Sequence, residues 1–116
     1  MVWTNSIRED AMTIIEESIR AVLPEAAVIK ALKCKEFKGK VVLVAIGKAG
    51  WNMAKAASDV LGSKVERGIV ITKYGHSRGP IEGCEIFEAG HPVPDEKSVQ
   101  ATAKVLEMVS TLTSED

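Results

Sequence analysis

A lysine directly after a glycine follows a short apolar run, and this turn could bind an anion. Val41–Ile46 contains only branched or small apolar residues, and it ends at Gly47 and Lys48. An apolar run of this length is typical of a strand buried on both faces of a parallel sheet. The amphipathic stretch that begins near Gly50 predicts a helix, whose first N–H groups and dipole attract negative charge. We therefore expect Gly47 and Lys48 to hold a carboxylate or a phosphate group of a ligand.

Histidines occur at the ends of two further predicted strands. His76 follows the strand predicted at residues 67–72, and His91 follows the strand predicted at residues 84–89. The carboxyl ends of parallel strands meet at one edge of a sheet, so all three turns share one rim if the strands are parallel. His76 could bind substrate hydroxyls or phosphate, or it could be a loop histidine bonded to backbone. His91, between a glycine and a proline, could face a ligand or belong to a structural turn.

Three other residues have simpler interpretations. Lys73 ends the second predicted strand and could belong either to the site or to the surface. Asp95 precedes the last predicted helix and is expected to cap it. Cys84 is expected to pack in the core.

Several familiar motifs are absent. The P-loop pattern fails because Ala49 follows the lysine and Val42 stands where its first glycine would be. The dinucleotide pattern fails because Ala45 takes the place of one of its glycines. The two histidines lack the spacing of a zinc pair, and no G-x-S-x-G motif occurs. We therefore assign no metal ligand in this chain.

Composition excludes other classes of function. The 116 residues include 15 basic and 16 acidic residues, a balance that predicts binding neither to nucleic acid nor to an anionic membrane. No apolar stretch approaches the roughly 20 residues of a membrane span, and the N-terminus lacks the pattern of a signal peptide. Cys34 and Cys84 show no paired motif, so we expect reduced thiols and a cytoplasmic protein.

Helical and strand periodicity gives the order of the elements that position these turns. The predicted elements are a helix over residues 7–22 capped by Ser6, a helix over residues 25–33 after Pro24, a strand over Val41–Ile46, a helix over residues 50–61 stopped by Gly62, a strand over residues 67–72, a polar loop over residues 77–83, a strand over residues 84–89 and a helix capped by Asp95. The positions expected to face inward are Ile7, Ala11, Ile14, Ile15, Ser18, Ile19 and Val22 in the first helix, Met53, Ala54, Ala57 and Leu61 in the third, and Val99, Ala103, Leu106 and Val109 in the last.

This order predicts an α/β fold with helices on both faces of a sheet. A strand, a helix and a second strand in succession favour a parallel, right-handed unit. The expected architecture is a three-layer α/β/α sandwich, with a partial sheet of about three mostly parallel strands and two N-terminal helices. Three strands make a narrow sheet, and the chain ends in the polar residues 111–116. We therefore expect a fragment of a larger protein, with an uncovered sheet edge and apolar helix faces without partners.

Three segments together resemble a known family. The segments VVLVAIGKAGWNMA (41–54), GIVITKYGH (68–76) and EAGHPVPDE (88–96) occur in the order and spacing of the type 2 glycerate kinases, the MOFRL-type family whose members are often labelled hydroxypyruvate reductases. The resemblance covers nearly the whole chain. The second and third segments are distinctive, whereas the Gly-Lys-Ala turn alone is a weak signal.

The resemblance implies an activity and a set of site residues. This family phosphorylates D-glycerate at its 2-hydroxyl with ATP and a divalent metal such as Mg²⁺. Its larger N-terminal domain is Rossmann-like, and a smaller second domain closes a cleft against it. Lys48 matches an active-site lysine and is the expected catalytic residue, and the expected substrate-binding residues are Gly47, Lys48, His76 and His91. Residues 1–116 would form only the first quarter of the enzyme, without most nucleotide- and metal-binding residues, so the isolated chain is expected to be inactive.

Three alternative functions remain open at this point. A phosphosugar-binding module of the sugar-isomerase type also has a Gly-Lys turn after a buried strand, but it usually continues with serine where this chain has Ala49. A hydroxypyruvate reductase would follow the family label, although no dinucleotide motif supports it. A non-catalytic module could cover its exposed sheet edge by forming a homodimer.

Overall fold

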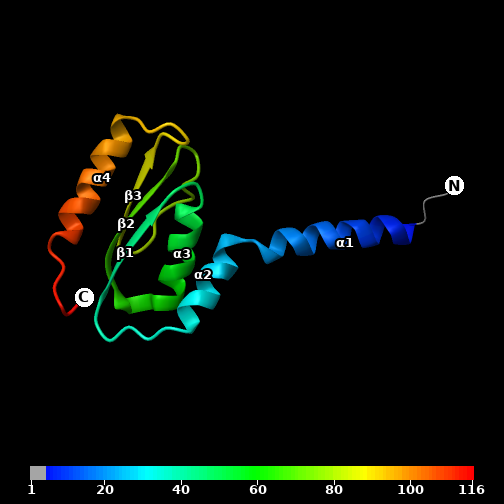
Figure 1. The fold of residues 1–116 in the computed structure, drawn as a ribbon, viewed down its shortest axis with the longest axis horizontal. Helices are drawn as coiled ribbons and strands as arrows, with labels where there is room; N and C mark the ends of the chain where they lie inside the picture. The colour runs from blue at the N-terminus through cyan, green and yellow to red at the C-terminus, as the bar shows by residue number, and fades with distance from the viewer. Residues whose placement is uncertain (1–4) are drawn as a thin grey trace.

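The fold is a three-stranded parallel sheet with helices on both faces (Figure 1). The computed structural model describes residues 5–116. Its elements are α1 (Asn5–Ala21), α2 (Pro24–Lys33), β1 (Val41–Ile46), α3 (Gly50–Leu61), the short 3₁₀ helix η1 (Gly62–Lys64), β2 (Val65–Lys73), β3 (Cys84–Ala89) and α4 (Glu96–Val109). The predicted α/β class and the order of elements are confirmed, and β2 is longer than the expected strand at residues 67–72.

All three strands run in the same direction. The sheet order is β1-β2-β3, with Val44 opposite Ile69 and Ile71 opposite Phe87. The third strand, whose direction the sequence left open and on which the shared rim depends, is therefore parallel to the other two. The turns after β1, β2 and β3 all leave the same edge of the sheet.

Alternating residues of β2 divide the core into two layers, because successive side chains of a strand point to opposite faces. Ile69 and Ile71 pack with Ala101 and Val105 of α4. Val70, which is fully buried, packs on the other face with Ala54 of α3. The sheet thus lies between α4 on one face and α3 on the other, which is the expected three-layer arrangement.

Small residues let α3 approach the sheet closely. Ala54 and Ala57 are buried as predicted, and a Cβ on Gly50 would lie 3.3 Å from the carbonyl oxygens of Ala45 and Ile71. The prediction for Met53 is wrong, because its side chain is 40 % exposed beside the groove between α2 and α3. The positive φ of Gly62, +56°, ends α3 as expected.

The predicted buried stripe of α1 is wrong. The helix forms, but none of its residues is buried, and it projects from the sheet-containing body (Figure 1). Ser6 lies inside α1, which begins at Asn5, so Ser6 is not the cap that the sequence indicated. The helical pattern predicted an apolar face, but no element within residues 5–116 covers it.

The inner stripe predicted for α4 is also wrong in part. Ala101 and Val105 face the sheet and Val109 packs beside them, whereas Val99 and Leu106 are 69 % and 63 % exposed. The exposed Ala103 is likewise not an inward position. Alanine at the point of closest approach lets the helix lie nearer the sheet than the larger Val99 and Leu106 would permit. Asp95 caps α4 as predicted, in a reciprocal capping box with Ser98.

Strand β1 is covered on one face only, where Leu43 and Ala45 are half-buried. Val44 and Ile46 are 38 % and 62 % exposed, because α4 covers β2 and β3 and does not reach over β1. The expectation of a strand buried on both faces is thus wrong within these residues. The related expectation is confirmed: apolar faces of β1, α1 and α4 lack partners in the described part of the chain.

Candidate functional site

The turn after β1 needs glycine at its first position. Gly47 has a φ of +127°, which residues with a side chain rarely adopt. Its N–H donates to the carbonyl of Ile71 at 2.9 Å, and its own carbonyl accepts from the N–H of Gly50 at 2.9 Å. The Thr72 hydroxyl, on β2, donates to the same Gly47 carbonyl at 3.0 Å. Because Thr72 is only 2 % exposed, its hydroxyl is a buried clamp that holds the turn in place.

The first turn of α3 presents free donors beside a lysine. No hydrogen bond within residues 5–116 engages the backbone N–H groups of Lys48, Ala49, Trp51 or Asn52. The Lys48 side chain is exposed and forms no ion pair with any residue in that range. Free N–H groups, the positive end of the helix dipole and an ammonium group favour an anion at this point.

The structure brings Lys48 and His76 together. Both line a cavity of about 360 Å³, together with Ala49, Asn52, Gly75 and Arg78. The His76 Nδ1 lies 3.3 Å from the Lys48 carbonyl oxygen, and the His76 N–H donates to the Lys73 carbonyl at 3.0 Å. The first contact matches the alternative that we left open, a histidine bonded to backbone. It also places the imidazole beside the lysine turn.

Sequence reasoning missed two residues of this cavity. Arg78 lies in the polar loop predicted at residues 77–83, where loop composition gave no periodicity that would single it out. Asn52 lies in the first turn of α3, and its Nδ2 donates to Glu25 Oε1 of α2 at 2.6 Å. The available signal for Asn52 was its place in the first turn of the predicted helix, four residues after Lys48.

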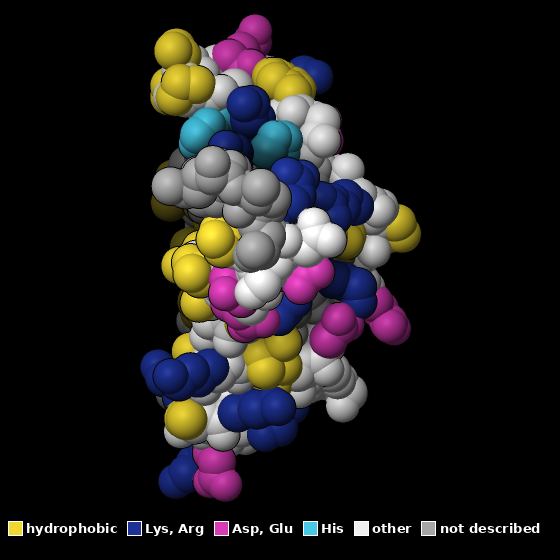
Figure 2. All heavy atoms as spheres, turned by 90° about the vertical axis from the view of Figure 1, so that its right-hand side faces the viewer, with side chains coloured by type: hydrophobic (Ala, Val, Ile, Leu, Met, Phe, Trp, Pro, Cys, Tyr) yellow, Lys and Arg dark blue, Asp and Glu magenta, His cyan; other side chains and the backbone are white. Residues whose placement is uncertain are grey.

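The cavity is electrostatically suited to an anion. Its lining contains Lys48 and Arg78 and no carboxylate. Figure 2 shows both histidines of the chain near the upper end of one face, with basic side chains beside them. His91 is exposed and does not line the cavity with His76, so the structure places the two histidines on one rim but not in one pocket.

The turn that carries His91 is tied to the turn that carries His76. The Tyr74 hydroxyl donates to Asp95 Oδ2 at 2.6 Å, and Lys97 Nζ lies 5.6 Å from the centre of the Tyr74 ring. The hydrogen bond from Tyr74, with further ones from the backbone of Gly90 and from Ser98, holds the pKa of Asp95 well below its usual value. The same Asp95 carboxylate raises the pKa of Tyr74.

The Tyr74–Asp95 bond predicts a titration that can be observed directly. Tyr74 is the one tyrosine of the chain, so tyrosinate absorbance should show a pKa above that of free tyrosine. Because the pKa of Tyr74 is raised in the folded protein, the stabilisation from its bond to Asp95 is complete below the ordinary tyrosine pKa. That stabilisation is lost as pH rises through the raised pKa of the folded protein. Because the pKa of Asp95 is lowered in the folded protein, the stabilisation from its ionised carboxylate is present above the ordinary carboxyl pKa. It is lost as pH falls through the lowered pKa of the folded protein. Asp95→Asn should return the Tyr74 pKa toward its ordinary value, and an unchanged pKa would contradict the assignment.

Comparison with protein families matches residues 10–116 to a domain of unknown function, DUF4147. This chain belongs to the DUF4147 family. It is 52 % identical over 111 residues to a D-glycerate 2-kinase of Thermotoga maritima, covering 96 % of this chain and 26 % of the relative. It is 39 % identical over 115 residues to a glycerate 2-kinase of Pyrococcus horikoshii, covering 90 % of this chain and 26 % of that protein.

The remaining comparisons agree with the resemblance seen in the sequence. A relative from Agrobacterium vitis, 38 % identical over all of this chain and 26 % of its own length, has a hydroxypyruvate reductase name. The crystal structure of glycerate kinase from Thermotoga maritima superposes with a TM-score of 0.89 at 51 % identity, covering 97 % of this DUF4147 chain and 27 % of that one. The resemblance to the glycerate kinases is therefore confirmed. The chain spans about a quarter of the length of these relatives.

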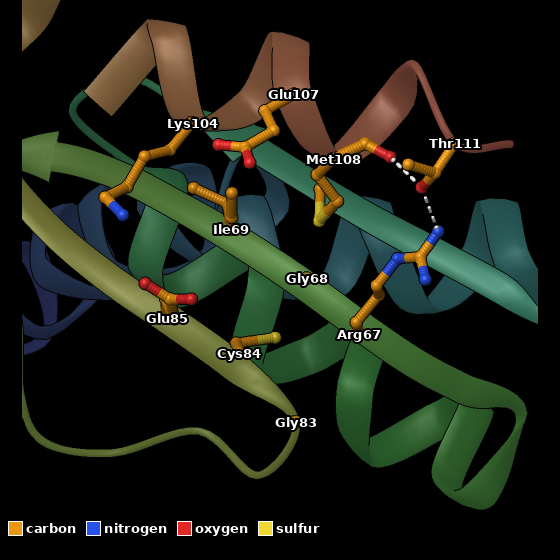
Figure 3. Close-up of a pocket in the computed structure, with 10 residues that line it drawn as sticks. All are labelled: Arg67, Gly68, Ile69, Gly83, Cys84, Glu85, Lys104, Glu107, Met108 and Thr111. Carbon is orange, nitrogen blue, oxygen red and sulfur yellow. Dashed lines mark hydrogen bonds between the residues drawn. The ribbon is translucent and has the colours of Figure 1, made fainter. Parts of the chain in front are cut away.

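A second cavity of the DUF4147 chain, of about 620 Å³, has no excess of positive charge. It lies between β2, β3 and α4 toward the strand starts, away from the rim, and Arg67 and Lys104 are balanced there by Glu85 and Glu107 (Figure 3). Arg67 donates to the Thr111 hydroxyl at 2.9 Å. The balance of charge makes this cavity a poorer site for an anion than the one beside Lys48.

The remaining sequence predictions have mixed outcomes. Cys34 and Cys84 are free thiols, as expected. Cys84 is half-buried and packs beside the α3 core cluster, and burial raises its pKa. Lys73 is half-buried and does not line the Lys48 cavity, which favours its surface interpretation. No helix in the described part of the chain is long and apolar enough to cross a membrane.

Proposed function

We propose that this chain is part of a glycerate 2-kinase that transfers a phosphoryl group from ATP to the 2-hydroxyl of D-glycerate. We further propose that residues 1–116 are the N-terminal part of its larger, Rossmann-like domain. The observation that carries the proposal is the cavity beside Lys48. Among residues 5–116 it combines a lysine without an ion pair, an arginine, N–H groups without a hydrogen bond and a histidine, and none of its lining residues in that range is acidic. The relatives with glycerate 2-kinase names support the choice of substrate.

Lys48 acts in this proposal through charge. Phosphoryl transfer passes through a transition state with negative charge spread over the transferring group, so catalysis depends on positioning and on neutralising that charge. Glycerate also carries a carboxylate. The Lys48 ammonium, the N–H groups of α3 and the Arg78 guanidinium can bind one of these anionic groups within the same cavity.

His76 acts as a hydrogen-bonding group for the substrate. The Lys48 carbonyl can only accept a hydrogen bond, so the 3.3 Å contact with His76 Nδ1 requires the proton on that nitrogen. In a neutral imidazole, Nε2 is then an acceptor that can orient a substrate hydroxyl. Gly47 supplies the backbone shape that brings Lys48 beside this ring. His91 lies outside the cavity on the third turn of the same rim, and we propose that it contacts a part of the substrate that extends beyond the cavity.

ATP and Mg²⁺ would supply the phosphoryl group and its counter-charge. Residues 5–116 do not fit the metal: they contain no cluster of three His, Cys, Asp or Glu side chains, and the Lys48 cavity has no carboxylate. We therefore place metal and nucleotide binding largely on parts of the complete enzyme outside these residues.

The cellular setting follows from the same proposal. A kinase acting on a small metabolite is expected in the cytoplasm, and the two free thiols fit that compartment. The formal net charge of −1 supports a small-molecule substrate in preference to nucleic acid or a membrane surface. The exposed edge of β1 would suit a homodimer if the remainder of the enzyme leaves it uncovered.

Activity of the complete enzyme tests the proposed function. We expect ATP-dependent conversion of D-glycerate to 2-phosphoglycerate, with the product distinguished from the 3-phosphate by a coupled assay. Residues 1–116 alone should show no turnover, because they lack the opposite wall of the cleft. Oxidation of NADH or NADPH in the presence of hydroxypyruvate, without phosphorylation of glycerate, would instead establish the reductase. Preferential binding of sugar phosphates would favour the phosphosugar module.

A further inference from the structure

Two side-chain hydrogen bonds, made by residues two positions apart, join the three turns of the rim. The His76 Nδ1 contacts the Lys48 carbonyl oxygen, which links the turns after β2 and β1. Two residues before His76, Tyr74 bonds to Asp95 and so links the turn after β2 to the segment after β3. Lys48, His76 and His91 lie in turns that follow separate strands, and these side-chain bonds hold the turns against one another.

Asp95 divides its two carboxylate oxygens between two tasks. Oδ1 accepts from the Ser98 N–H at 3.0 Å and from the Ser98 hydroxyl at 3.1 Å, and these bonds cap α4. Oδ2 accepts from the Tyr74 hydroxyl at 2.6 Å, and this bond, which we call the bridge, is not part of the helix cap. The cap and the bridge use different oxygen atoms of Asp95, so a substitution can weaken one and leave the other.

The segment between β3 and α4 folds back tightly on itself. A Cβ on Gly90 would clash with the Val93 carbonyl and would lie 3.1 Å from the Asp95 carboxylate. His91 therefore sits in a short turn whose two ends meet at Asp95. A group that fixes Asp95 from outside the turn fixes the place of His91 as well.

We propose that Tyr74 is a positioning residue, whose hydroxyl bond to Asp95 holds the His91 turn against the His76 turn so that both histidines meet one substrate. The inference rests on the proposed function for the identity of that substrate. Tyr74 acts through Asp95, and its effect is to limit the number of positions that the His91 turn adopts before D-glycerate binds.

Tyr74→Phe in the complete enzyme tests the inference, because it removes only the hydroxyl and keeps the ring beside Lys97. We expect KM for D-glycerate to rise about tenfold, the effect of losing one hydrogen bond to a charged group. KM for ATP should stay within twofold. Ser98→Ala is the matched control, since it weakens the α4 cap while Oδ2 still accepts from Tyr74. It should lower Tm at least as much as Tyr74→Phe and leave KM for D-glycerate within twofold.

A second variant separates the bridge from general stability. Asp95→Asn keeps a good helix cap but replaces the charged acceptor. It should raise KM by no more than Tyr74→Phe does, because the asparagine amide can still bond to the tyrosine oxygen, and the double variant should be no worse than Tyr74→Phe alone, because the two residues form one contact. An unchanged KM for Tyr74→Phe, an equal rise in Ser98→Ala, or additive effects in the double variant would overturn the inference.

Amide hydrogen exchange tests whether the Tyr74–Asp95 bond holds the two turns, and it does so without any measurement of the reaction. In the complete protein, Tyr74→Phe should speed amide exchange in both turns, residues 74–78 and 90–95, whereas Ser98→Ala should speed it only at the start of α4. If the wild-type enzyme did not phosphorylate D-glycerate, the proposed function would fall while this exchange pattern could still support the bridge. Exchange in residues 90–95 that is unaffected by Tyr74→Phe would overturn it.

Discussion

Lys48→Ala in the complete enzyme is expected to lower kcat/KM for D-glycerate by about 10²- to 10³-fold, the usual loss when one group that stabilises transition-state charge is removed. Lys48 lies at the start of α3 and forms no ion pair with any residue that the structure describes, and the helix dipole alone contributes only about 0.3–2 kcal/mol at such a position. Arg78, across the cavity, would retain part of the ground-state binding. Steady-state kinetics should therefore show a larger fall in kcat than rise in KM.

Lys55→Ala is the control for the loss of a lysine from α3. Lys55 pairs with Asp59 one helical turn along and does not line the Lys48 cavity. An exposed pair of this kind is worth little, so kcat/KM should stay within twofold of the wild type. If Lys48→Ala behaved like Lys55→Ala, the catalytic role of Lys48 would be refuted.

The sequence predicted the elements well because each element carries its own local signal. The apolar run at Val41–Ile46 and the glycine after it define β1 and its turn without reference to the remainder of the chain. Asp95 predicts the start of α4 in the same way, because a cap acts on the N–H groups next to it. Parallel pairing followed from the short crossover between β1 and β2.

Predictions of burial were weaker because burial depends on neighbours. The apolar residues of α4 form more than one possible stripe along the helix. Ala101 and Val105 pack against the sheet, whereas Val99 and Leu106 are exposed. Ile46 has the pattern of a doubly buried strand residue, yet it is exposed because nothing in residues 5–116 covers that part of β1. An apolar pattern of this kind indicates that another segment must cover the strand, but it does not indicate which segment.

The candidate site shows the same limit. Lys48 and His76 were identified because they follow strands whose ends must meet. Arg78 came from a loop, where the path of the chain decides which side chain reaches the cavity. The bond between Asn52 and Glu25 joins residues 27 positions apart on two helices, and no local pattern indicates it.

Gly47→Ala should both destabilise the protein and impair the reaction. At a φ of +127° a side chain strains the backbone, at a cost of about 1–3 kcal/mol in the free energy of unfolding. A Cβ at this position would have nothing within 4 Å, so the effect comes from strain and not from a clash. If the turn relaxes, the Gly47 N–H moves away from Ile71 and Lys48 moves with it. A displacement of about 1 Å can cost about 10²-fold in rate, which steady-state kinetics would detect.

Gly62→Ala separates strain from function. Gly62 also has a positive φ, +56°, and a Cβ there would likewise meet nothing within 4 Å, but it lies at the opposite end of α3 from Lys48. With a ψ of −128°, Gly62 lies in a backbone region that alanine rarely adopts, at a cost of about 1–3 kcal/mol, so thermal unfolding should show both variants destabilised. Only Gly47→Ala should lose activity, because only its turn carries the lysine. Equal kcat/KM in the two variants would mean that the shape of the Gly47 turn does not position Lys48 for the reaction.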